Sequence, residues 1–88
     1  MEDKRKAIDR GRKAAAILNL DSVVVEAIEE LEKRYTNEWK ASKVDDVVKR
    51  EKAYMAVVVL DDIKTQLQTY ADRGRFAEKQ LQKEQTLQ

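Results

Sequence analysis

The sequence contains no cysteine, no histidine and no proline, and only two glycines among its 88 residues. The lack of cysteine excludes a disulfide framework, a thiolate nucleophile and a zinc–thiolate site. The lack of histidine removes the most frequent general base and the commonest transition-metal ligand. Carboxylates, lysines, tyrosines and hydroxyls are what is left for chemistry, so we expect the protein not to be an enzyme and to bind no cofactor.

Long apolar runs and an excess of one charge are also missing. No segment approaches the roughly 18 to 20 consecutive apolar residues of a membrane-spanning helix, and the first residues are not those of a signal peptide. We therefore expect a soluble protein of the cytoplasm with no membrane partner. The 18 basic residues nearly balance the 17 acidic ones, and 40% of all residues are charged. This composition is typical of long helices and coiled coils.

The sequence is organised around an apolar ladder in its longest segment without a helix breaker. The ladder consists of Val48, Met55, Val59, Ile63, Leu67 and Tyr70. Its gaps of seven, four, four, four and three residues follow helical periodicity. We therefore predict a helix over residues 46–73, roughly 42 Å long at about 1.5 Å per residue. A domain of this size is narrower than that, so we expect the ladder to contact a second copy, in a dimer or a larger oligomeric bundle.

A second apolar stripe precedes the ladder and includes Tyr35 and Trp39. Its spacing predicts a helix over residues 22–41. The connection to the next helix is only a few residues long, which favours antiparallel neighbours. We expect Tyr35 and Trp39 to lie in the core or at an interface, where they anchor the hairpin near its turn.

Residues 1–20 form a further predicted helix, which is basic and has a thin apolar side. Gly11 falls in its middle, where glycine costs about 1 kcal/mol against alanine. Either the helix bends there or another backbone packs close to it. Together, the patterns predict an all-α fold in one domain, residues 1–88, with a short N-terminal helix before an antiparallel helical hairpin whose second arm is long.

The end of the chain allows two interpretations, which differ at Gly74. In one, the long helix continues through this glycine, because Phe76, Ala77 and Leu81 stay in phase with the apolar ladder. In the other, Gly74 ends the helix and a shorter one follows. We favour continuation over residues 74–88, with a polar, glutamine-rich tail that frays.

Basic residues cluster in the predicted N-terminal helix. They are Lys4, Arg5, Lys6, Arg10, Arg12 and Lys13. Such a cluster could contact the phosphates of a nucleic acid, although exposed helices commonly carry similar charges for solubility. The second helix is acidic at its N-terminal end, which argues against a helix-turn-helix. We expect weak, nonspecific binding to nucleic acid at most.

Two pairs of aspartates, Asp45-Asp46 and Asp61-Asp62, are the candidates for a magnesium or calcium site. Adjacent residues of a helix point about 100° apart, and the sequence contains no glycine-punctuated calcium loop. We expect these carboxylates to cap helices or face solvent, and we predict no metal site.

Several short pieces of the sequence resemble a known group of proteins. The pieces are Arg10-Gly11-Arg12-Lys13-Ala14, Val25-Glu26-Ala27, Tyr35, Glu38-Trp39, Arg50-Glu51, Leu67 and Gly74-Arg75. Over roughly residues 8–82 the chain is similar to small, mostly uncharacterised helical proteins encoded in the head–tail morphogenesis gene clusters of tailed phages and prophages. The glutamine-rich tail departs from the apolar or acidic ending usual in that group. The resemblance implies a viral or prophage origin and no catalytic residues.

Two functional hypotheses follow. The first is a non-enzymatic structural or virion-assembly accessory protein that acts through helical interfaces with itself and with another phage structural or packaging protein. The resemblance then implies a place in the host cytoplasm or on the virion. The alternative is a small nucleic-acid-binding or DNA-packaging regulatory protein that uses the basic N-terminal helix.

Overall fold

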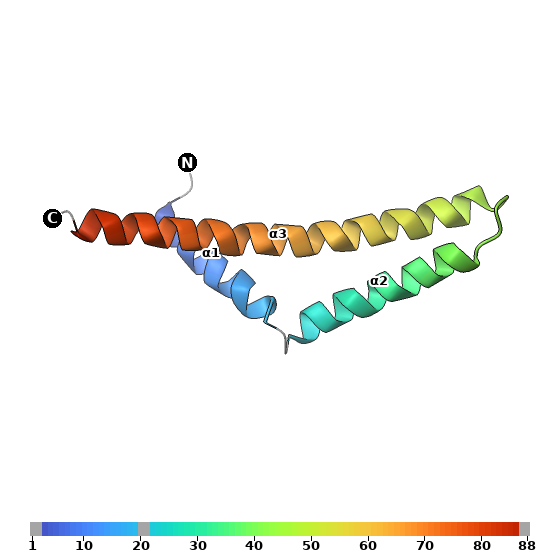
Figure 1. Cartoon of the computed structure of the whole chain (residues 1–88), viewed down its shortest axis with the longest axis horizontal. Coiled ribbons are helices and arrows are strands. Elements are labelled where there is room, and N and C mark those ends of the chain that lie inside the picture. Colours follow the sequence, from blue (N-terminus) through green and yellow to red (C-terminus); the bar gives the residue numbers. More distant parts are fainter. Residues whose placement is uncertain (1–2, 20–21, 87–88) are drawn as a thin grey trace.

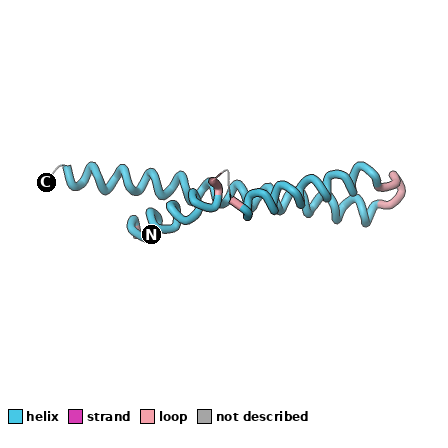
Figure 2. The backbone as a smooth tube through the Cα atoms, turned by 90° about the horizontal axis from the view of Figure 1, so that it is seen from below, coloured by secondary structure: helices cyan, strands magenta, loops and turns pink. Residues whose placement is uncertain are grey.

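The computed structural model describes residues 3–19 and 22–86, and these form three helices and their connections (Figure 1). The helices are α1 (Lys4–Ile17), α2 (Val23–Ala41) and α3 (Val47–Thr86). α2 lies antiparallel along the first half of α3, and α1 crosses the second half (Figures 1 and 2). The molecule measures 66 × 28 × 14 Å. The all-α prediction, with a short first helix and a long third helix that packs back on the others, is confirmed.

The helix boundaries lie within a few residues of those predicted, and α1 ends at Ile17, three residues before the predicted end. α2 begins one residue after the start predicted for it and ends at the predicted Ala41. α3 runs for 40 residues without a break at Gly74, so the favoured interpretation of a continuous helix is confirmed. α3 is helical as far as Thr86, where an ion pair between Lys4 and Glu84 joins this end of α3 to α1. The fraying predicted for the tail stays a prediction. The predicted ends at residues 1–2, 20 and 87–88 lie outside the described residues.

Short polar side chains set the helix ends. The Asp3 carboxylate accepts a hydrogen bond from the backbone N–H of Arg5 at 3.1 Å, at the start of α1. The Asp46 carboxylate accepts one from the N–H of Lys49 at 3.2 Å, at the start of α3. Such contacts satisfy backbone donors that have no partner inside the helix. Of the paired aspartates, which we expected to cap helices or face solvent, Asp46 is the one that caps α3.

The packed face of α3 follows an alternating three-and-four spacing. It consists of Ala53, Val57, Leu60, Lys64, Leu67, Ala71 and Gly74, all buried or half-buried. This is the spacing of a coiled-coil seam. Among the described residues, Ile28 of α2 is the one large apolar side chain in the buried class, and the others are alanines. The core of a single chain is therefore thin.

α1 and α3 cross at two glycines that face each other. A Cβ atom built on Gly11 would lie 2.7 Å from the Cα atom of Gly74 and 2.8 Å from the carbonyl oxygen of Tyr70. A Cβ atom on Gly74 would lie 2.8 Å from the Cα atom of Gly11. Buried alanines flank both glycines, namely Ala7 and Ala14 on α1 and Ala71 and Ala77 on α3. The close approach of a second backbone, one of the two explanations considered for Gly11, is therefore the one observed.

Charged side chains secure the crossing from its edges. Arg12 donates to the Glu78 carboxylate at 2.6 Å, and Lys4 pairs with Glu84. The guanidinium carbon of Arg10 lies 5.1 Å from the centroid of the Tyr70 ring, within the range of a cation–π contact. These contacts fix the direction in which α1 crosses α3, which small residues alone leave loosely defined.

An ion pair between Lys64 and Glu32 joins α3 to α2 within their seam. The Nζ atom of Lys64 lies 3.2 Å from Oε1 and 3.3 Å from Oε2 of Glu32, and the geometry of a hydrogen bond is met at Oε2. Both side chains are half-buried. A polar pair at a seam position favours one register over its neighbours, because any shift leaves a desolvated charge without a partner.

Enlarging Gly11 should separate α1 from α3. We expect Gly11→Leu to lower the free energy of unfolding by about 2 kcal/mol, since overpacking costs about 3 kcal/mol at its upper end and the gain in helix propensity offsets about 1 kcal/mol. Ala16→Leu places the same side chain at an exposed position of α1 and serves as the control. Urea unfolding of both variants measures the difference, and equal stability would contradict the crossing.

Candidate protein-interaction surface

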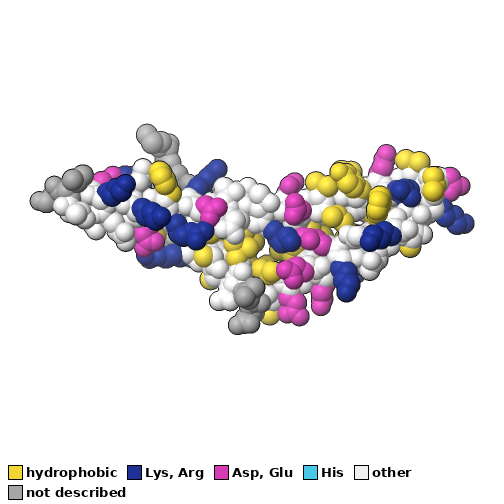
Figure 3. Space-filling model, viewed as in Figure 1, with side chains coloured by type: hydrophobic (Ala, Val, Ile, Leu, Met, Phe, Trp, Pro, Cys, Tyr) yellow, Lys and Arg dark blue, Asp and Glu magenta, His cyan; other side chains and the backbone are white. Residues whose placement is uncertain are grey.

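The side of α3 away from its packed face carries large apolar side chains that are open to solvent. We call Val47, Val48, Met55, Val58, Val59 and Ile63 the apolar face of α3. Their exposed fractions run from 40% at Val58 to 65% at Val48. Hydrophobic side chains gather over the hairpin half of α3 in the space-filling view (Figure 3). A contiguous apolar surface of this kind is typical of a site of protein interaction.

The structure divides the predicted ladder between two sides of α3. Val48, Met55, Val59 and Ile63 lie on the apolar face, whereas Leu67 and Tyr70 are half-buried. Each gap of four residues turns the side chain by about 40°, so the ladder winds around the helix from Met55 to Leu67. The first four residues are therefore not core residues of a single chain, and their predicted role at an interface between chains stays a prediction.

Trp39 lies at the surface of the hairpin end, with 39% of its side chain and backbone area exposed. Trp39 is therefore not a core residue of the single chain. Tyr35, one turn earlier on α2, is half-buried. The guanidinium carbon of Arg50 lies 5.3 Å from the Trp39 ring centroid. Two cavities, of about 220 and 250 Å³, are both lined by Trp39 and Tyr54. α2 ends two residues after Trp39, so no further helical turn covers the ring.

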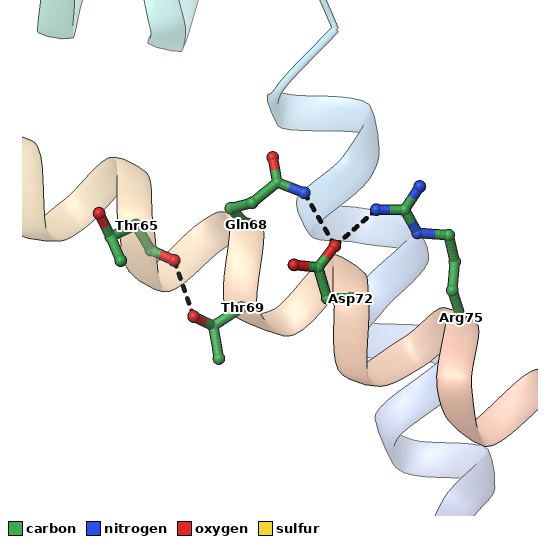
Figure 4. A network of polar contacts seen from close by, with 5 residues as sticks. All are labelled: Thr65, Gln68, Thr69, Asp72 and Arg75. Carbon is green, nitrogen blue, oxygen red and sulfur yellow. Dashed lines mark hydrogen bonds and ion pairs between the residues drawn. The ribbon is translucent and has the colours of Figure 1, made fainter.

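The apolar face ends where a polar network begins on α3 (Figure 4). The Gln68 amide donates to Asp72 Oδ1 at 3.0 Å, and Arg75 donates to the same oxygen at 2.5 Å. The Thr69 hydroxyl donates to the carbonyl of Thr65 at 2.9 Å. The Gln68, Asp72 and Arg75 side chains thus satisfy one another, and the Thr69 hydroxyl bonds to the backbone of its own helix.

The basic residues of α1 are largely occupied by contacts within the chain. Besides the pairs that Lys4 and Arg12 make with α3, Lys13 pairs with Asp9 at 3.1 Å. Arg10 stacks on Tyr70. Among the described residues, Arg5 and Lys6 are the two members of the predicted cluster whose side chains make no such contact. Two of the six cations therefore have no competing contact within the described part of the chain, whereas phosphate must displace a carboxylate or a ring from the other four.

The paired aspartates do not come together in space with other potential ligands. Within residues 3–19 and 22–86, no group of three or more acidic side chains is placed to hold a metal ion. In the same part of the chain, no helix combines the length and the apolar character required to cross a bilayer.

The carboxyl group of Asp72 should titrate below the ordinary range for aspartate. The hydrogen bond from Gln68 is the largest cause of its lowered pKa, followed by the hydrogen bond from Arg75. Arg75 also lowers this pKa through its positive charge. We therefore expect both Gln68→Ala and Arg75→Ala to raise the pKa of Asp72, as measured by NMR titration. Because folding lowers the pKa, the stabilisation is present above the unfolded-state pKa and is lost as the pH falls through the folded-state value. An unchanged pKa in Gln68→Ala would contradict the network.

The candidate surface thus joins the apolar face of α3 to the hairpin end around Trp39 and Tyr54. Two charged residues, Arg50 and Glu51, line its hairpin end beside these rings. The similarity to phage morphogenesis proteins stays a prediction. Comparison of the chain with protein-family models, with curated proteins and with solved structures finds no match.

Proposed function

We propose that this protein is a non-enzymatic assembly protein that acts through helical protein–protein interfaces. The observation that carries the proposal is the apolar face of α3, where six large aliphatic side chains lie 40% or more exposed in the single chain. Solvent is an unfavourable environment for such a surface, and a partner helix would remove it from water. All six side chains of this face belong to the half of α3 that lies along α2.

The size of the face favours reversible association over a permanent complex. Complete burial of a valine, isoleucine or methionine side chain contributes about 1.5–3 kcal/mol. These side chains are already about half covered, so a partner adds about 1 kcal/mol for each of them. The total of about 6 kcal/mol is close to the lower end of the cost of association, about 4–15 kcal/mol. Polar contacts at the rim must therefore contribute to orientation and affinity.

The setting that we propose is virion assembly in a phage or prophage. The support is the resemblance in sequence, which includes Glu38-Trp39, Arg50-Glu51 and Gly74-Arg75. Trp39 and Arg50 stack on each other at the hairpin end, and Gly74 lies at the crossing of α1 and α3. The partners would be further copies of the chain and another phage structural or packaging protein, in the host cytoplasm or on the virion.

Placing charges on the apolar face should abolish association. We expect the native protein to sediment as a species heavier than the 10.2 kDa chain at micromolar concentration. The double variant Met55→Glu, Val59→Glu should sediment as a monomer, because buried carboxylates without partners are strongly unfavourable. Its far-UV circular dichroism should be unchanged, since both side chains point away from the rest of the chain.

A control with the same change in charge separates the face from a general electrostatic effect. Gln82→Glu together with Gln85→Glu also adds two negative charges to exposed positions of α3, outside the apolar face. This control should associate as the native protein does. Equal behaviour of the two double variants would remove the support for the proposal.

The alternative, a nucleic-acid-binding protein, has less support because most cations of α1 are paired within the chain. We expect binding to duplex DNA that weakens as salt rises, with a log–log slope near −1.8 if Arg5 and Lys6 each replace one counterion. Arg5→Ala with Lys6→Ala should remove this binding. A slope of −5 or steeper in a filter-binding titration, or retention of binding in the double variant, would favour the alternative.

A further inference from the structure

The outward side of α3 carries a second seam with coiled-coil spacing. Its residues are Val48, Lys52, Met55, Val59, Asp62 and Gln66, separated by gaps that alternate between four and three, and all are exposed. At about 100° per residue, Met55 and Val59 lie about 160° and 200° around the helix from Val57. Val57 belongs to the packed face, so this seam lies almost directly opposite to the contact with α2.

Opposite charges flank the apolar pair at the middle of this seam. Lys52 precedes the apolar pair Met55 and Val59, and Asp62 follows it. The side chains of Lys52 and Asp62 make no ion pair or hydrogen bond with another described residue. They are therefore available to a partner that presents the same two charges in the reverse order.

The chain itself is such a partner when it is turned around. We infer that the apolar face binds a second copy of this chain, with the two α3 helices antiparallel and a two-fold axis beside residue 57. This register places Lys52 against Asp62 of the second copy, Met55 against Val59 and Val48 against Gln66, each pair twice. The inference rests on the proposed function and names the partner and the orientation.

A parallel, in-register pairing of two α3 helices is unfavourable because of the same two charges. It would bring Lys52 against Lys52 and Asp62 against Asp62, and like charges opposite each other weaken association. The antiparallel pairing is isologous, so it closes at two copies and leaves α2 of each chain on the outside. The product is a row of four helices in which the two α3 helices form the centre.

Cysteine substitutions test the orientation directly, because the native chain has no cysteine. We expect Lys52→Cys with Asp62→Cys to form a covalent dimer under mild oxidation. In the antiparallel register, residues 52 of the two copies lie about 15 Å apart along the helix axis. This exceeds the roughly 4–7 Å between Cα atoms that a disulfide requires. Neither single variant should therefore form the covalent dimer, and efficient dimer formation by Lys52→Cys alone would overturn the inference.

Charge exchange provides a second, independent readout. Asp62→Lys should weaken self-association at least tenfold in sedimentation equilibrium. In this variant Lys52 of each copy faces a second lysine, at position 62 of the other copy, so both symmetric contacts become repulsive. Lys52→Asp combined with Asp62→Lys should return the dissociation constant to within about threefold of the native value. Helical content should be the same in all variants, since both positions are exposed and make no side-chain contacts within the chain.

The outcomes separate this inference from the proposed function. Suppose that Met55→Glu with Val59→Glu abolishes association, but Asp62→Lys associates as the native protein does and the single cysteine variants cross-link as well as the double one. The apolar face is then an interface in another register, so this inference fails while the proposed function stands. If the apolar variants have no effect on association, the proposed function fails as well. Rescue by the charge exchange, together with the selective disulfide, supports both.

Discussion

The contact between Gly11 and Gly74 determines how the rest of the molecule is arranged. Each glycine occupies the space that a Cβ atom of the other would need, so the two backbones touch and α1 is held across the second half of α3. This position brings the cations of α1 against Glu78 and Glu84. It also leaves α2 as the one helix that lies along the first half of α3, and a single helix can cover only one side of another. The outward side of that half is therefore open to a partner.

Much of the fold could be predicted from the sequence, because helical periodicity and breaker residues are local signals. The hairpin, its short connection and the continuity of α3 through Gly74 all follow from spacing. The face that packs could not be read from hydropathy, because α3 has apolar residues around most of its circumference. The true packed face is marked by Ala53, Ala71 and Gly74, whose small side chains carry little hydrophobic signal. Their three-and-four spacing with Val57 and Leu67 was the signal available in the sequence.

The candidate site was predictable in part. Val48, Met55, Val59 and Ile63 were identified as apolar positions on one ladder, but their exposure depends on which helices happen to cover α3. The basic cluster of α1 shows the same limit. Arg12 and Glu78 lie 66 positions apart in the chain, and no local pattern indicates that they form an ion pair. Net charge along a segment therefore overstates the charge that a folded helix offers to phosphate.

Association is expected to add to the stability of the folded chain, because the core of a single copy is thin. In the described residues Ile28 is the one large apolar side chain in the buried class, and alanines and glycines make up the rest of the buried set. Small residues allow close backbones but remove little apolar area from water, so a single chain gains limited stability from them. A partner that binds the folded chain and not the unfolded one adds to stability by mass action. The outward seam of α3 would then form a second buried contact, on the side of α3 opposite to α2, and so add to the limited apolar area that a single chain buries.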